Sequence, residues 1–288
     1  MKVLLFFIDG LGLGSNNPQE NPIIAANTIY LDRILNNEFA IMIPTDATLG
    51  VKGIPQSATG QTTLFTGVNA AKIMGHHISG FPGPGLRKII FEGNLFKSLK
   101  ERGKKVTFAN AYSQPYLKNF LSGDTKGSVT TNMVLSADLE FRLTDLLITG
   151  NAVYRDMTNK LINDLDSRIP LIKHEEAAKN LAKIVRENDL TLYEYFQTDR
   201  VGHKQNFEEA IELIENIDKF IGQVIEELDF SDTLLIITSD HGNIEDLSVK
   251  THTLNMVPTI LIGAKKEEIE GKIRSLTDIT PAILELFV

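Results

Sequence analysis

The segment LLIITSDHGN, residues 234–243, joins a run of apolar residues to a short run of polar ones. Its first part, 234–238, has the apolar and β-branched composition of a buried strand. Asp240 and His241 follow almost directly, so a carboxylate and an imidazole stand where the strand ends. Oxygen and nitrogen ligands in this combination suit Zn, Mn or a similar divalent cation. The segment therefore predicts a metal site at a strand end, with further ligands coming from other segments.

Apolar runs of strand length recur along the chain and alternate with segments of helical spacing. The helical segments are residues 94–102, 175–187 and 207–228. Such alternation is typical of an α/β protein with a mainly parallel sheet and helices on both faces. Besides 234–238, the predicted strands are residues 3–8, 106–109, 190–196 and 258–262.

Residues 113–172 differ from the rest of the chain because they lack clear buried strands and are polar and rich in Ser and Thr. We interpret them as a small inserted lid. Residues 1–112 and 173–288 then form the metal-binding catalytic core. The Gly- and Pro-rich segment 76–85 is predicted to be a loop over one rim of the site, where His76 and His77 could face substrate.

Composition restricts both the partners and the ligand chemistry. The net charge of −8, without a basic block, argues against nucleic acid and against anionic membrane surfaces as partners. The chain has no cysteine, so metal ligands must be Asp, Glu, His or hydroxyl groups. The N-terminal apolar run is interrupted by Asp9 and is too short for a membrane span or a signal-peptide core. We therefore expect a cytoplasmic protein; its oligomeric state does not follow from the sequence.

Three carboxylates follow predicted strands, and in an open parallel sheet such positions meet at one edge. Two divalent cations would bring a charge of about +4 against −3 from the carboxylates, which leaves a net positive site for a phosphate. Six potential ligands are too many for one tetrahedral ion and suit two, about 4 Å apart. The six are Asp9, Asp199, His203, Asp240, His241 and His252.

A nucleophile candidate lies in IPQSATGQTTLFTG, residues 54–67, where small and hydroxyl residues precede a helix-like apolar segment. Ser57 would stand near the start of that helix. There a metal can hold its oxygen while helix amides face an incoming phosphoryl group. On physical grounds alone, Thr59 and Thr62 remain alternatives.

Together these segments resemble the alkaline phosphatase superfamily, especially its cofactor-independent phosphoglycerate mutase and phosphopentomutase branch. The family pattern contains S/TxxGH, DxxGH, DHGN and THTxNxVP segments, which read SATGQ, DRVGH, DHGN and THTLNMVP here. The resemblance implies one metal on Asp199, His203 and His252. It implies a second on Asp9, Asp240, His241 and the oxygen of Ser57, and it selects Ser57 as the nucleophile.

The resemblance also has departures. Gln61 stands where the mutases usually have His, and the inserted region is shorter than the mutase lid and lacks its arginine-rich pocket. We therefore expect a two-metal enzyme, with Mn or Zn and Mg as a further option, that acts on a small phosphate ester through a phosphoserine. Phosphatase and phosphomutase are both open, and a phosphodiesterase or a non-catalytic metal-binding regulator is the alternative. The cations to test for substrate contact are Lys118, Lys126, Arg142 and Arg155.

Overall fold

A computed structural model describes residues 1–36 and 38–288 of the chain. Six strands form one sheet in the order β2-β6-β5-β1-β4-β3. The strands are β1 Lys2–Ile8, β2 Ile41–Thr45, β3 Val106–Phe108, β4 Leu190–Tyr195, β5 Thr233–Thr238 and β6 Val257–Gly263. The helices are α1 Pro22–Ala25, α2 Tyr30–Leu35, α3 Ser57–Thr66, α4 Ala70–Met74, α5 Pro84–Glu92, α6 Leu95–Glu101, α7 Gln114–Ser122, α8 Val129–Ser136, α9 Asp145–Ile148, α10 Lys160–Asn163, α11 His174–Glu187, α12 Gln197–Gly202, α13 Phe207–Glu227, α14 Lys266–Glu270 and α15 Leu276–Glu285.

The centre of the sheet is parallel, as the sequence predicts. β1 pairs in parallel with β4 and β5, and β3 pairs in parallel with β4. β6 is antiparallel to both β5 and β2. The expectation of a mainly parallel α/β sheet is confirmed, with β6 as the antiparallel member.

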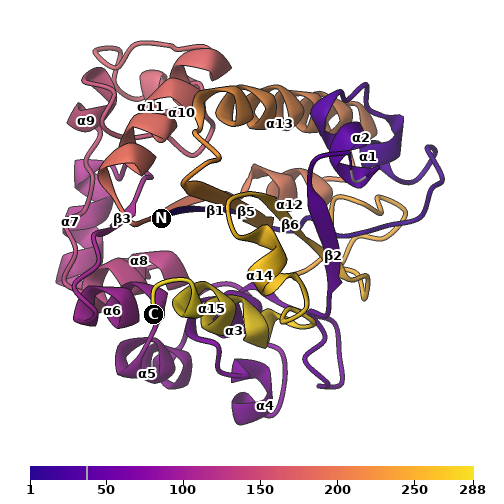
Figure 1. The fold of residues 1–288 in the computed structure, drawn as a ribbon, viewed down its shortest axis with the longest axis horizontal. Coiled ribbons are helices and arrows are strands. Elements are labelled where there is room, and N and C mark those ends of the chain that lie inside the picture. The colour runs from indigo at the N-terminus through magenta and orange to yellow at the C-terminus, as the bar shows by residue number, and fades with distance from the viewer. Residues whose placement is uncertain (37) are drawn as a thin grey trace.

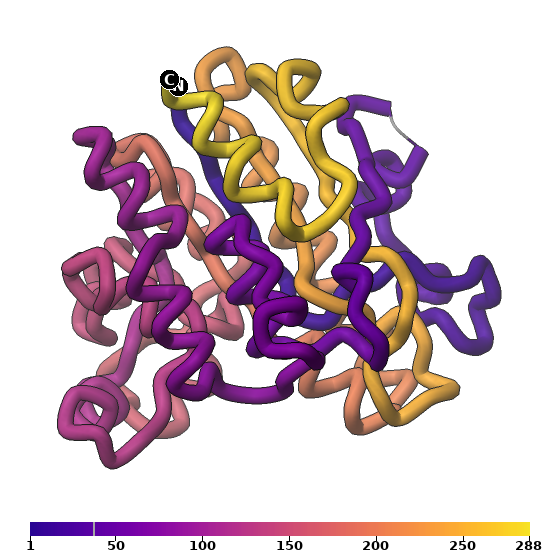
Figure 2. The backbone as a smooth tube through the Cα atoms, turned by 90° about the horizontal axis from the view of Figure 1, so that it is seen from below, coloured from indigo at the N-terminus to yellow at the C-terminus, as the bar shows by residue number. Residues whose placement is uncertain are grey.

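Both faces of the sheet are buried, which explains the continuous apolar strands. Along β1, Leu4 and Phe6 pack into one hydrophobic cluster, and Leu5 and Phe7 pack into the other. Helices α11 and α13 cover the first face, and α3, α6, α8 and α15 cover the second (Figure 1). On the second face α15 packs against α3 (Figure 2). The Thr280 hydroxyl there donates to the carbonyl of Leu64 at 2.7 Å.

The sequence pattern missed β2. This strand is at the edge of the sheet, is mostly half-buried and contains Pro44, which has no amide hydrogen for a ladder. Half-burial and a proline both remove the signals by which a strand is identified from sequence.

The region predicted as an inserted lid, residues 113–172, contains α7 to α10. Val129 and Met133 of α8 join the hydrophobic cluster on one face of the sheet. Other residues of the region, Leu147, Ala152, Tyr154, Ile162 and Ile169, form a small separate cluster with Ala111. The division into core and lid stays a prediction. Within the described residues, none of the helices combines the length and apolarity that crossing a membrane requires.

Candidate metal centre

The predicted ligands come together because strand ends meet at one edge of the sheet. Asp9 follows β1 directly, Asp199 lies in α12 just after β4, and Asp240 and His241 follow β5. His252 precedes β6. Since β6 runs antiparallel to β5, its start lies at the edge where the neighbouring strands end.

The first group of side chains surrounds His241, which is fully buried. Its Nε2 atom lies 3.3 Å from Asp9 Oδ1 and 3.6 Å from Asp240 Oδ2. The same nitrogen is 2.9 Å from Ser57 Oγ. Four side chains from three separate segments thus lie close together.

The second group surrounds Asp199. His252 Nε2 lies 3.3 Å from its Oδ1 atom, and His203 Nε2 lies 3.5 Å from its Oδ2 atom. The two imidazole nitrogens are 3.2 Å apart, although 45% of the His203 side chain is exposed. The ring of His252 also stacks on that of His241 at 3.7 Å between centroids, so the two groups are continuous.

Ser57 differs from Thr59 and Thr62 in what its hydroxyl contacts. Ser57 is the first residue of α3, and its Oγ faces the cluster. The hydroxyls of Thr59 and Thr62 are fully buried and donate to the carbonyls of Gln56 and Ala58, at 3.1 and 2.6 Å. Their bonding to the helix backbone supports Ser57 as the reactive hydroxyl.

The carboxylates of the cluster are electrostatically unequal. Burial raises the pKa of Asp9 well above its usual range, and the charges of Asp240 and Asp199 raise it further. Burial also acts to raise the pKa of Asp199, but the hydrogen bond with His252 and the charge of His241 outweigh it and lower the pKa. Asp9 is therefore the carboxylate that most needs a nearby positive charge to stay ionised.

The two stacked histidines are also unequal. Burial lowers the pKa of His241, which favours the neutral imidazole that can bind a metal. Burial acts in the same direction on His252, but its hydrogen bonds with Asp199 and with the carbonyl of Pro55 raise the pKa overall.

This donor set fits divalent cations. Asp9 Oδ1 is buried and receives no hydrogen bond from the described residues, so a ligand position is free. Two trios have donor atoms within 4.8 Å of one another: Asp9, Asp240 and His241, and Asp199, His241 and His252. Carboxylate and imidazole donors that lie this close together are suited to bind Zn or Mn. The trios share His241, so the division of the ligands between two ions stays a prediction.

Two further residues donate hydrogen bonds to the candidate ligands, and motif spacing did not assign them a role. Gln61 lies one turn after Ser57 on α3, and its amide donates to Asp9 Oδ2 at 3.2 Å and to Asp240 Oδ2 at 3.1 Å. Asn243 donates to Asp199 Oδ1 at 2.6 Å. Both amides orient carboxylates in the way that outer-shell partners do in metal sites.

Glu245 joins the loops that carry the ligands. Its buried carboxylate accepts from the amides of Gly12 and Asn243 at 3.1 and 2.7 Å, and from the side chains of Thr253 and Asn255. A Cβ atom on Gly12 would lie only 2.2 Å from this carboxylate. The loops after β1 and β5 and the loop before β6 are thereby fixed to one another.

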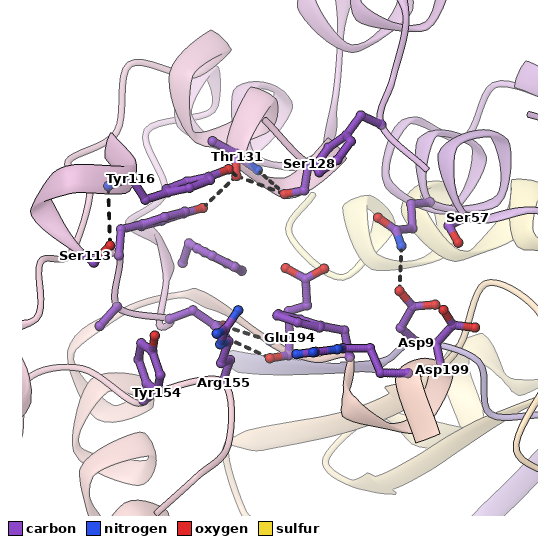
Figure 3. A pocket seen from close by; sticks show the side chains of 18 of the residues that line it. Asp9, Ser57, Ser113, Tyr116, Ser128, Thr131, Tyr154, Arg155, Glu194 and Asp199 are labelled. Atoms are coloured by element: carbon purple, nitrogen blue, oxygen red, sulfur yellow. Dashed lines mark hydrogen bonds between the residues drawn. The ribbon is translucent and has the colours of Figure 1, made fainter. Parts of the chain in front are cut away.

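A cavity of about 570 Å³ opens from the cluster toward residues 113–172 (Figure 3). Asp9, Ser57 and Asp199 line one end of it, and Glu194 of β4 lies between them and the far end. Burial raises the pKa of Glu194 to about 7, against an opposing hydrogen bond from Thr130.

Among the cations proposed for substrate contact, the described cavity wall includes Arg155 but not Lys118, Lys126 or Arg142. Arg142 instead donates to the hydroxyl of Thr107 and the carbonyl of Asn151. Arg200, next to Asp199 in DRVGH, lines the cavity and was missed. His77 lies 3.3 Å from the carbonyl of Val51 and, like His76 and His174, is not part of the wall described.

The fold and the cluster together define an α/β protein with a carboxylate–imidazole centre at the carboxyl edge of its sheet, the donor set of a metalloenzyme. The profile of the Metalloenzyme superfamily matches residues 1–288, the whole chain. The protein therefore belongs to the Metalloenzyme superfamily, and the resemblance noted in its motifs is confirmed.

Similar proteins support this assignment. The 2,3-bisphosphoglycerate-independent phosphoglycerate mutase of Thiobacillus denitrificans is 35% identical over 120 residues, which cover 39% of this chain and 23% of the mutase. The match therefore spans less than a quarter of that relative's length. Two solved structures share the fold across nearly the whole chain. The PH0037 protein of Pyrococcus horikoshii has a TM-score of 0.63 at 17% identity, covering 99% of this chain and 96% of its own. The alkaline phosphatase of the Antarctic bacterium TAB5 has a TM-score of 0.57 at 12% identity, covering 99% and 97%.

Proposed function

We propose that this protein is a phosphoryl-transfer enzyme that acts on a phosphate ester through a phosphoserine at Ser57. The observation that carries the proposal is the position of Ser57 Oγ, which stands at the start of α3, 2.9 Å from His241, and lines the cavity. A nucleophile, a cluster of cation ligands and a space for substrate thus adjoin one another.

In the proposed reaction, Ser57 Oγ forms a bond to phosphorus while the ester P–O bond breaks. The leaving alcohol keeps the electron pair and takes a proton from solvent, and the serine proton also passes to solvent. Bound divalent cations supply positive charge that favours the serine alkoxide and offsets the charge of the phosphoryl oxygens. The amides at the start of α3 face the phosphoryl group. Transfer of the phosphoryl group to water gives a phosphatase, and transfer to a second substrate hydroxyl gives a phosphomutase.

Seven side chains would hold the cations: Asp9, Ser57, Asp199, His203, Asp240, His241 and His252. Carboxylate and imidazole donors favour Mn or Zn, with Mg as a further option. The substrate class is a small phosphate ester, and the cytoplasmic location expected from the sequence belongs to the same proposal.

The test is turnover of 4-nitrophenyl phosphate and a panel of monoesters by protein loaded with Mn²⁺ or Zn²⁺. We expect Ser57→Ala to lower kcat by at least about 10³-fold, because the nucleophile is lost. Thr62→Val is the matched control, since its hydroxyl bonds to the helix backbone, and it should retain turnover. Mass spectrometry of acid-quenched enzyme should find phosphate on Ser57. Full activity of the Ser57→Ala variant would refute the assignment.

The same measurements address the alternatives. Turnover of bis-4-nitrophenyl phosphate above that of the monoester would identify a phosphodiesterase. Full metal occupancy without turnover of any ester would identify a metal-binding regulator.

A further inference from the structure

The far end of the cavity carries features that a phosphoglycerate-sized substrate would not use. Six of the residues that line it are aromatic: Phe81, Phe108, Tyr112, Tyr116, Tyr154 and Phe196. The rings of Tyr112 and Tyr116 are stacked, 5.8 Å between centroids and 11° from parallel. A cavity of about 570 Å³ falls within the range of sites that enclose drug-sized molecules. The wall is therefore suited to a flat group larger than a triose.

A buried hydrogen-bond acceptor lies in the same wall. Glu194 is 7% exposed, and its Oε2 atom accepts from Thr130 at 2.7 Å. Within the described part of the chain, no residue donates to its Oε1 atom. Figure 3 places Glu194 between the metal-side residues Asp9 and Asp199 and the aromatic end of the cavity. Glu194 lines the cavity, so its second carboxylate oxygen can accept an N–H or O–H group from a ligand.

A hydrogen-bond donor lies there as well. The guanidinium of Arg155 lies over the rings of Tyr154 and Phe196, at 5.6 and 5.5 Å from their centroids. Its Nε atom is buried and has no acceptor among the described residues. The wall of the cavity thus offers an acceptor at Glu194 and donors at Arg155 and Arg200, which suits a group with both a donor and an acceptor.

We propose that the leaving group of the substrate is nucleoside-like: an uncharged alcohol bearing a planar heterocycle, whose ring packs on the cavity's aromatic side chains and whose polar edge meets Glu194 and Arg155. This inference rests on the proposed function and narrows its substrate class. Glycerate is disfavoured as a leaving group because it has no ring to pack on the aromatic side chains of the cavity.

The first test compares substrates that differ only beyond the phosphate. We expect metal-loaded enzyme to have a kcat/KM for at least one nucleoside 5′-monophosphate that exceeds that for ribose 5-phosphate by 10-fold or more. 3-Phosphoglycerate should be poorer than that nucleotide. The proposal is overturned if ribose 5-phosphate or 3-phosphoglycerate is used as well as every nucleotide.

The second test uses variants of the far end. Glu194→Gln removes the charge of the acceptor while keeping its shape, and should raise KM for the preferred nucleotide about tenfold with kcat little changed. Tyr116→Leu should act in the same direction. For both variants, kcat/KM for ribose 5-phosphate, which lacks the ring, should fall much less than kcat/KM for the nucleotide. Phe91→Leu, an exposed aromatic of α5 outside the described cavity wall, is the matched control. An equal loss with all substrates would show a merely structural role and overturn the assignment.

The outcomes separate this inference from the proposed function. Turnover of 4-nitrophenyl phosphate that depends on Ser57, without a preference for nucleotides, leaves the phosphoryl-transfer function and overturns the nucleoside-like substrate. Absence of turnover with every ester overturns the phosphoryl-transfer function, and the substrate class with it. Calorimetric titration of the Ser57→Ala variant gives a readout without catalysis, and should find tighter binding of the nucleotide than of ribose 5-phosphate.

Discussion

Gln61 is the residue whose role is most specific to this chain, because its side-chain amide is shared between two carboxylates of the cluster. It donates to Asp9 at 3.2 Å and to Asp240 at 3.1 Å, while it is itself 5% exposed. The amide keeps both carboxylates oriented and partly offsets their repulsion without competing as a strong ligand.

We therefore predict that Gln61→Leu weakens binding of Mn²⁺ or Zn²⁺ by about 10- to 100-fold, the usual loss when an outer-shell partner is removed. Isothermal titration calorimetry on metal-free protein measures the change. Gln114→Leu, at the exposed start of α7, is the control and should bind metal as the wild type does. Unchanged affinity in Gln61→Leu would show that the carboxylates hold their positions without it.

Glu194 gives a prediction for pH dependence. Burial raises its pKa from 4.5 to about 7 in the folded protein. Between these pH values the folded state therefore binds more protons than the unfolded state. The contribution of Glu194 to the free energy of unfolding is complete below about pH 4.5 and is lost as the pH rises through 7. The shift corresponds to about 3 kcal/mol. Urea unfolding of metal-free protein at pH 5 and pH 8 should show a smaller loss of stability for Glu194→Gln than for the wild type. Parallel losses in the two proteins would contradict the raised pKa.

At this scale, sequence reasoning identified the candidate ligands, which the structure brings together, but not the residues that contact them. Asp240, His241 and Ser57 stand at strand or helix ends, and their chemistry is visible in the type of residue. Gln61 and Glu194 act through partners far away in sequence: Gln61 contacts Asp240, 179 positions later. Neither periodicity nor motif spacing specifies such contacts, because they depend on how the helices pack on the sheet.

At the scale of elements, the position of α3 against the loop after β5 determines where Ser57 lies. Gly60 permits the close approach, since a Cβ atom there would lie 2.8 Å from the carbonyl oxygen of Asp240. The backbone of this helix thus packs directly on the backbone of the ligand loop.

Gly60→Ala tests this contact. In an exposed helix the substitution stabilises by up to about 1 kcal/mol, but here the added methyl group must push α3 or the loop aside. We predict destabilisation by about 1–3 kcal/mol together with weaker metal binding, measured by urea unfolding and calorimetry. Gly85→Ala in α5 is the control, because its added Cβ atom would meet only the flexible end of the Met74 side chain. A stabilised Gly60→Ala protein with normal metal affinity would rule out the close approach.

The elements that the sequence predicted are those whose buried residues follow a regular pattern. β1, β4 and β5 are buried along almost their whole length, and α13 has one apolar face, so composition and spacing identify them. The direction of β6 was not predictable, because its apolar sequence is equally suited to a parallel or an antiparallel neighbour. That direction matters for the site, since it brings His252 to the edge where the other candidate ligands lie.

For the whole molecule, the cluster joins parts of the chain that are distant in sequence. Residues 9, 57, 199, 240 and 252 come from the two ends and the middle of the chain, and the unfolded chain does not hold them together. The region 113–172 contributes two of the six aromatic side chains of the cavity wall, Tyr116 and Tyr154, which its polar sequence did not predict.

A cation that binds such a cluster stabilises the folded state alone, and this gives the prediction for the intact protein. At a concentration 100 times its Kd, a single ion adds about 2.7 kcal/mol, which for a domain of this size raises the Tm by roughly 5–10 °C. Differential scanning calorimetry with EDTA and with Mn²⁺ or Zn²⁺ measures the shift. Asp9→Asn should lose most of this shift. Its metal-free Tm should nevertheless equal or exceed that of the wild type, because the substitution removes both the burial of a carboxylate and its repulsion with Asp240 and Asp199, which together raise the pKa of Asp9. His76→Asn, in the exposed loop, should keep the full shift. If metal stabilised Asp9→Asn as much as it stabilises the wild type, Asp9 would not be a ligand. The cluster at the strand ends would then not bind a cation in the proposed way.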